Sequence, residues 1–162
     1  MNSTFIGLVD CLDNERSEDV RSLTTFVDCT METQFEGKAD RLITPVVVYG
    51  RHKNRILLGL KALWDTGSRQ SCISAELADR LDLHETGRIT VINPIGSTTV
   101  KPTYRVDIAI WEGMVFEDIE VVEYPLEKHD CDVLIGMDII SKGRFLLEVK
   151  DGNTHMEFTA TD

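Results

Sequence analysis

Asp65, Thr66 and Gly67 place a carboxylate, a hydroxyl and a glycine directly after the apolar run "RILLGLKALW" at 55–64. Asp and Gly are common turn residues, so one interpretation is a plain turn at the end of a strand. The other is that Asp65 is placed for chemistry. Two carboxylates held close together share one proton, and such a pair can deprotonate a water while polarising a scissile carbonyl. The question is then which elements surround Asp65 and where a second carboxylate would come from.

The pattern from residue 42 onward predicts many short strands. Two β-rich runs, 42–50 and 55–64, are joined by the polar "RHKN" and predict a hairpin. Residues 87–111 predict two strands around a turn at "NPIGS", and "MVFEDIEVVEY" follows a turn at 112–113. The chain closes with "RFLLEVKDGNTHMEFTA", which predicts a hairpin with an Asp-Gly turn.

Two helices are expected between these strands. "SAELADRLDL" at 74–83 predicts a helix that Ser74 caps. "MDIISK" predicts a short second helix that Gly143 ends. Asp138, at the start of this second helix, is a candidate second acid, but its position favours an N-cap or first-turn role. The fold class expected is therefore mainly β, and closed or sandwich-like.

Residues 1–40 differ from the rest of the chain. They carry the acidic cluster "DNERSED" and a weak helical spacing of apolar residues. We interpret them as an N-terminal acidic extension with one or two short helices. The extension either covers part of the core or acts as a regulatory segment, and the sequence does not decide between these roles.

Composition limits the classes of partner. The chain has 162 residues and a formal net charge of −11, so an acidic surface would repel phosphate backbones and nucleic-acid binding is not expected. No apolar stretch is long enough to span a bilayer, and no signal peptide is recognised. Four cysteines without a C-x-x-C spacing predict reduced core thiols and a cytoplasmic protein. Neither a metal nor a cofactor is expected.

Three motifs together resemble the retropepsin-like aspartic proteases. They are "ALWDTGS", the hairpin around "NPIGS", and "VLIGMDII" at the start of a helix. The resemblance covers roughly residues 42–160 and is closest to the small bacterial, single-domain members. It implies a closed, β-barrel-like acid protease fold with one or two short helices over residues 41–162. It also implies an aspartic endopeptidase acting on peptide or protein substrates.

The resemblance also assigns roles to residues. The catalytic set is Asp65, Thr66 and Gly67. Substrate-binding residues are expected at Ser68, Arg69, Pro94, Ile95 and Gly96. Support for the active loop is expected from Leu134, Ile135 and Gly136. The loop at 93–97 resembles a flap over the cleft, although a plain surface hairpin is the alternative, and Arg69 is alternatively an ordinary solvated residue.

A single chain carries only one Asp-Thr-Gly. The hypothesis is therefore a homodimer with two-fold symmetry, in which Asp65 of each subunit faces the other across the axis. The alternative is a catalytically inactive module of the same fold, retained for peptide binding or dimerisation. Trp64 bears on this choice, because a side chain so bulky must fill core beneath the loop or distort it. Substrate specificity and pH optimum do not follow from the sequence.

Overall fold

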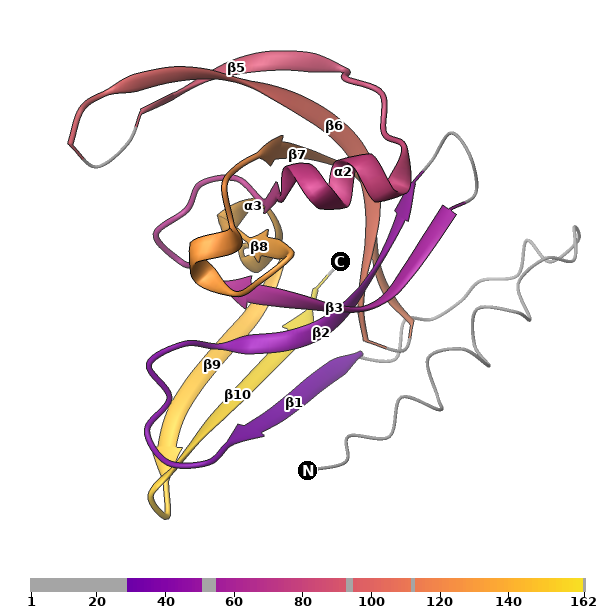
Figure 1. The fold of residues 1–162 in the computed structure, drawn as a ribbon. Helices are drawn as coiled ribbons and strands as arrows, with labels where there is room; N and C mark the ends of the chain where they lie inside the picture. The colour runs from indigo at the N-terminus through magenta and orange to yellow at the C-terminus, as the bar shows by residue number, and fades with distance from the viewer. Residues whose placement is uncertain (1–28, 51–54, 93–94, 112, 162) are drawn as a thin grey trace, which may run out of the picture.

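The computed structural model describes residues 29–50, 55–92, 95–111 and 113–161, and Figure 1 shows their fold. The helices expected early in the N-terminal extension, the turn at 51–54 and Pro94 lie outside these residues. Within the described residues most of the chain is β-strand, with two short α-helices and one turn of 3-10 helix, η1 (Glu127–His129).

Six strands form a closed ring. In the order of their hydrogen bonding they are β2 (Ile43–Gly50), β3 (Arg55–Trp64), β8 (Val133–Ile135), β4 (Cys72–Ile73), β7 (Met114–Glu123) and β6 (Thr98–Trp111). The ring closes because β6 pairs with β2 as well as with β7. Two of its pairings, β3–β8 and β4–β7, are parallel. The expected fold class, mainly β with a closed barrel and short helices, is confirmed.

The β2–β3 hairpin follows the predicted boundaries and leads directly to Asp65. Its strands pair antiparallel from Ile43–Leu63 to Gly50–Arg55, with an irregularity between Val46 and Val48. Pro45 pairs with β3 only, since the contact of β2 with β6 begins at Val47. A proline, which has no N–H to donate, is tolerated where one side of the strand is unpaired.

The C-terminal hairpin belongs to a second, three-stranded sheet. Strand β10 (Asn153–Ala160) lies between β9 (Gly143–Lys150) and β1 (Thr30–Phe35), and both pairings are antiparallel. The predicted Asp-Gly turn is present, with positive φ at both Asp151 and Gly152. Figure 1 shows this sheet extending below the barrel.

Strand β1 lies inside the segment interpreted as an N-terminal extension. Its residues pair with β10 from Thr30–Thr159 to Phe35–Thr154, so this part of the segment is strand rather than helix. The boundary proposed at residue 40 therefore stays a prediction, and the residues just before it belong to the second sheet.

Aromatic rings join the two sheets. Trp64, at the end of β3, stacks on Phe145 of β9 with ring centroids 5.6 Å apart. It also contacts Phe158 of β10, at 5.1 Å. Both Trp64 and Phe158 are buried in the main core. The core thus continues from the barrel into the second sheet directly below the residue that precedes Asp65.

The helices are short, and each follows a short barrel strand, α2 after β4 and α3 after β8. Helix α2 (Ala75–Leu81) begins as predicted, because the Ser74 side chain accepts a hydrogen bond from the Leu77 N–H at 3.1 Å. Helix α3 (Met137–Ile140) is capped at its C-terminus by Ser141. The prediction that Gly143 ends this helix is wrong. Gly143 begins β9, where a Cβ would lie 2.3 Å from the Thr159 carbonyl oxygen, so close strand packing explains this glycine.

The β5–β6 hairpin extends away from the barrel. Strand β5 (Gly87–Ile92) pairs only with the first part of β6, while the later part of β6 belongs to the barrel. Figure 1 shows the hairpin arching over the barrel and projecting beyond it. Its described tip residues are exposed, including Ile92 at 69% and Ile95 at 87%.

Candidate active site

Asp65 lies in a tight turn at the end of β3. Its backbone N–H donates to the Ile135 carbonyl at 3.0 Å, and its own carbonyl accepts from the Ser68 N–H at 3.2 Å. The Gly67 N–H donates to Asp65 Oδ1 at 2.8 Å. Oδ2 has no hydrogen bond within the described residues, and the side chain is half-buried. The carboxylate is thus fixed through one oxygen and leaves the other available.

Thr66 and Gly67 complete this turn. A Cβ at Gly67 would lie 3.1 Å from Asp65 Oδ1, so the glycine lets its backbone approach the carboxylate closely. Thr66 is exposed, and its hydroxyl has no hydrogen-bond partner among the described residues. The predicted catalytic tripeptide therefore forms one continuous turn on the surface of a single chain.

The β8–α3 connection supports the loop after Asp65. Met137 N–H donates to the Ser68 carbonyl at 2.9 Å, and Ser68 Oγ donates to the Gln70 carbonyl at 2.8 Å. A Cβ at Gly136 would lie 2.7 Å from the carbonyl carbon of Gln70. Only glycine fits at this position, because real Cβ atoms essentially never approach backbone so closely.

The predicted supporting pair faces two different cores. Ile135 is fully buried in the main core, and its carbonyl holds the Asp65 N–H. Leu134 belongs to a smaller cluster with Cys72, Val122 and others. Successive residues of a strand point to opposite faces, so this pair joins the two cores directly beneath the loop.

Trp64 fits the core below the turn. Its indole N–H donates to Thr44 Oγ1 at 2.9 Å, which satisfies its polar atom in a buried position. The side chain is 5% exposed and is stacked as described above. The bulk of Trp64 therefore fills the core, and the turn at Asp65 keeps its regular hydrogen bonds.

Asp138 does not contact Asp65 in the described hydrogen bonds. It lies in the first turn of α3, whose N-cap is Gly136. Its Oδ1 accepts from Ser71 Oγ at 2.8 Å and from the Ile139 N–H at 3.1 Å. Ser71, fully buried at the end of the active loop, was not predicted as a site residue. No local sequence signal marks it, because its partners lie 65 and 67 residues away.

Cys72 lies beneath the same loop. The pKa of its thiol is raised from an ordinary value of 9.0 to about 12, chiefly by burial, and the nearby carboxylates of Asp138 and Asp65 contribute in the same direction. A thiol that lies near both carboxylates and stays protonated is a neutral, apolar neighbour for the loop.

The remaining predicted binding residues lie on two separate parts of the surface. Arg69 is exposed and has no ion pair among the described residues. Ile95 and Gly96 are at the tip of the β5–β6 hairpin, where Gly96 has a φ of +84°. In Figure 1 this tip projects on the same side as the loop after β3.

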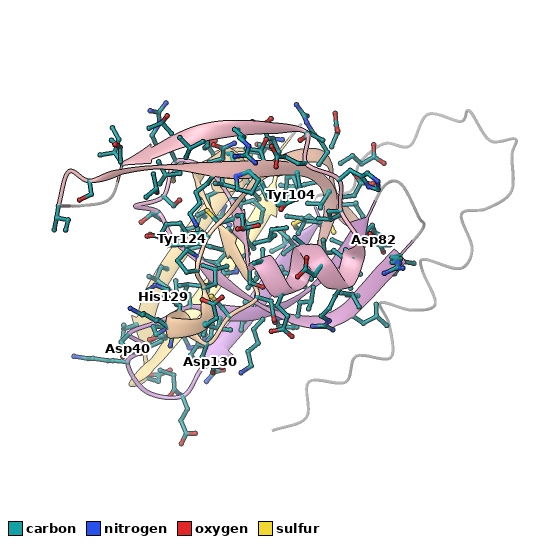
Figure 2. The ribbon with its side chains drawn as sticks, turned by 45° about the horizontal axis from the view of Figure 1, so that its top comes forward. Asp40, Asp82, Tyr104, Tyr124, His129 and Asp130 are labelled. Carbon is teal, nitrogen blue, oxygen red and sulfur yellow. The ribbon has the colours of Figure 1, made fainter. Side chains whose placement is uncertain are left out.

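Cys131 and His129 lie close in the sequence but differ in exposure. Cys131 is buried, whereas His129 is exposed beside Asp130 at the η1 turn (Figure 2). Asp130 accepts instead from Lys61 Nζ at 3.0 Å. Within the described residues, no group of three or more His, Cys, Asp or Glu side chains is arranged to hold a metal ion.

A family profile described as "gag-polyprotein putative aspartyl protease" matches residues 58–142, which is more than half of the chain. The chain belongs to this aspartyl protease family. The match contains the Asp65 turn, the β5–β6 hairpin and the β8–α3 support, so the family recognised from three motifs is confirmed. No curated protein matches the chain. None of the helices in the described part of the chain is long and apolar enough to cross a membrane.

Two solved structures are similar to this chain at low sequence identity. A retropepsin-like aspartic protease from Rickettsia conorii is 16% identical, with a TM-score of 0.48, covering 86% of this chain and 100% of that one. The retroviral protease-like domain of Ddi1 from Leishmania major is 18% identical, with a TM-score of 0.42, covering 67% of this chain and 82% of that one.

Proposed function

We propose that this protein is an aspartic endopeptidase that works as a symmetric homodimer, with one Asp65 from each subunit. The observation that carries the proposal is the hydrogen bonding of the Asp65 turn. The carboxylate is fixed through Oδ1 by the Gly67 N–H, while Oδ2 and the Thr66 hydroxyl have no partner within the described residues of one chain.

A second copy is the better source of the missing acid. Asp138 is the candidate within the chain, but its Oδ1 already accepts hydrogen bonds from Ser71 and Ile139. A two-fold axis at the Asp65 turn would bring two identical carboxylates together without any other acid. The same axis would let each Thr66 hydroxyl reach the opposite loop.

The chemistry follows from the pairing. Two carboxylates within hydrogen-bonding distance retain one proton between them and titrate as a unit. The ionised member takes a proton from a water that attacks the scissile carbonyl, and the protonated member donates to the carbonyl oxygen. The substrate class that this reaction requires is a peptide or protein.

The β5–β6 hairpin is the candidate cover for the bound peptide. It projects beyond the barrel and carries exposed Ile92, Ile95 and Val100 near its tip. A cover over the carboxylate pair would exclude bulk water, while leaving the attacking water in place, and would hold an extended peptide. Arg69 belongs to the loop that begins with Asp65, where an exposed cation can contact substrate.

The test compares Asp65→Asn with Asp40→Asn, a matched change at an exposed residue between β1 and β2. Asp65→Asn is expected to abolish cleavage of a peptide library, while folding by circular dichroism and dimerisation by sedimentation stay unchanged. Asp40→Asn is expected to keep full activity. A hydroxyl-containing peptide isostere is expected to inhibit, because it mimics the tetrahedral intermediate.

Two results would contradict the proposal. One is an active protein that sediments as a monomer at assay concentration. The other is wild-type protein that cleaves nothing between acid and neutral pH, which would favour the inactive binding or dimerisation module instead.

A further inference from the structure

The Ser71 hydroxyl connects two distant parts of the chain beneath the active loop. It accepts from the Gly136 N–H at 3.1 Å and lies 2.8 Å from Asp138 Oδ1. Ser71 is fully buried and stands at the end of the loop that begins with Asp65. Gly136 and Asp138 belong to the β8–α3 connection.

The donors and acceptors in this group have fixed directions. The Gly136 N–H is a donor, so Ser71 Oγ is its acceptor, and the single hydroxyl proton is directed to Asp138 Oδ1. That oxygen also accepts from the Ile139 N–H. Asp138 therefore acts twice as an acceptor through one oxygen. An asparagine, whose Oδ1 is also an acceptor, could make the same two bonds.

The other hydrogen bonds between the described loop and the β8–α3 connection run from backbone to backbone. Asp65 N–H binds the Ile135 carbonyl at 3.0 Å, and the Met137 N–H binds the Ser68 carbonyl at 2.9 Å. In the described structure, the bonds of Ser71 with Gly136 and Asp138 are the side-chain links between the loop and the β8–α3 connection. Without Ser71 Oγ, the buried Gly136 N–H would lose its acceptor, which a well-packed interior tolerates poorly.

We propose that Ser71 and Asp138 are positioning residues. Together with the Gly136 N–H they form a clamp that sets the position and orientation of the Asp65 loop relative to the β8–α3 connection. This role rests on the proposed protease function. In a symmetric dimer any displacement of the loop occurs in both subunits. The distance between the two Asp65 carboxylates therefore changes through both displacements together. A misplacement of about 1 Å can cost about a hundredfold in rate.

The experiment compares four variants in the full-length protein. Ser71→Ala and Asp138→Ala remove the clamp, whereas Asp138→Asn keeps its acceptor oxygen. Ser74→Ala is the matched control, because it removes another buried serine hydroxyl that caps α2 and contacts no loop residue.

The rate is measured per functional site, after titration with a tight hydroxyl-isostere inhibitor. Ser71→Ala and Asp138→Ala are expected to lower kcat by about ten- to a hundredfold with little change in KM. Asp138→Asn is expected to stay within a few-fold of wild type. The double variant Ser71→Ala/Asp138→Ala is expected to match the single variants, because both changes break one unit. Ser74→Ala is expected to lower the melting temperature while keeping kcat per site.

Hydrogen exchange supplies a readout that does not depend on activity. The Gly136 amide is expected to exchange slowly in wild type and much faster in Ser71→Ala, while remaining protected in Ser74→Ala. Unchanged exchange in Ser71→Ala would overturn the clamp geometry.

The kinetic results separate the two proposals. An active wild type whose kcat is unaffected by Ser71→Ala, or equally reduced by Asp138→Asn and Asp138→Ala, would overturn the clamp and leave the protease function standing. A wild type that cleaves no peptide would overturn the protease function and the catalytic role of the clamp with it.

Discussion

At the scale of single residues, the Cys72 thiol gives a prediction about reactivity. Its pKa is raised to about 12, chiefly by burial, so the reactive thiolate is scarce at pH 8. In the folded protein, Cys72 is expected to resist alkylation by iodoacetamide at pH 8 and to label rapidly in denaturant. Peptide mapping by mass spectrometry measures both. The raised pKa also means that this group favours folding below pH 9 and that its contribution is lost as the pH rises towards 12.

Rapid labelling of native Cys72 at pH 8 would contradict this environment. Cys29, which is half-buried, serves as the internal comparison within the described chain and is expected to label faster than Cys72.

Some residues of the site have a local signal in the sequence and others have none. Asp65, Thr66 and Gly67 are contiguous, so their turn can be predicted from the sequence. Gly136 was expected to support the loop because of the resemblance to the family. Ser71 was not predicted, because its contacts arise only when β8 brings Gly136 and Asp138 against it. Polar contacts across such separations depend on the completed fold.

Gly136→Ala tests the close approach below the loop. The new Cβ would meet the Gln70 backbone at 2.7, 2.8 and 3.0 Å, and backbone cannot swing aside like a side chain. We expect a loss of about 1–3 kcal/mol in the free energy of unfolding, which denaturant titration measures. The control is Gly87→Ala, whose Cβ would meet only the Thr103 hydroxyl at 3.1 Å. Equal stability of the two variants would argue against tight packing at Gly136.

At the scale of elements, hairpins were predictable and parallel pairings were not. Turn residues such as Asp151 and Gly152 predict a hairpin from the local sequence, and the register of the two strands follows from the turn. The parallel pairing of β3 with β8 has no such signal, although it places Ile135 beside Trp64 and so positions Asp65. Strand β1 was not predicted either, because no local signal marks its pairing. Its short run alternates, but its pairing with β10 is what makes it a strand.

The β5–β6 hairpin gives a prediction at this scale. Ile95 is 87% exposed, so Ile95→Ser is expected to change the free energy of unfolding by less than about 0.5 kcal/mol. If the hairpin covers the peptide, the same change raises KM several-fold, because an apolar contact to substrate is lost. The measurement is steady-state cleavage together with thermal unfolding.

Val149→Ser is the matched control, since Val149 is 55% exposed on β9 in the other sheet. Unchanged kinetics in Ile95→Ser would favour a plain surface hairpin over a flap.

At the scale of the whole molecule, the net charge of each copy opposes the association of two copies into a symmetric dimer. Each copy carries a formal net charge of −11, so bringing two copies together costs electrostatic free energy over and above the local contacts. The composition made this acidity plain from the start. The pairing of two copies is an inference from the single Asp-Thr-Gly, because one chain supplies only one Asp65 carboxylate.

Salt dependence follows from this repulsion. Dissolved ions screen charges beyond about 10 Å at 0.1 M, so raising the salt from about 0.02 to 0.3 M is expected to strengthen dimerisation several-fold. Analytical ultracentrifugation over a concentration series gives the dissociation constant at each ionic strength. A dissociation constant that rises with salt would indicate an interface dominated by attractive ion pairs instead.

The dependence of the Asp65 turn on β8 and α3 also fixes when the site can form during synthesis. The Gly136 N–H that binds Ser71 is 65 residues further along the chain, and the Ile135 carbonyl that holds Asp65 comes just before it. A chain still growing on the ribosome therefore has the acid and its local turn, but lacks the support from β8 and α3 until these elements have emerged. Under the proposed protease function, hydrolysis is expected only after this late segment has been synthesised.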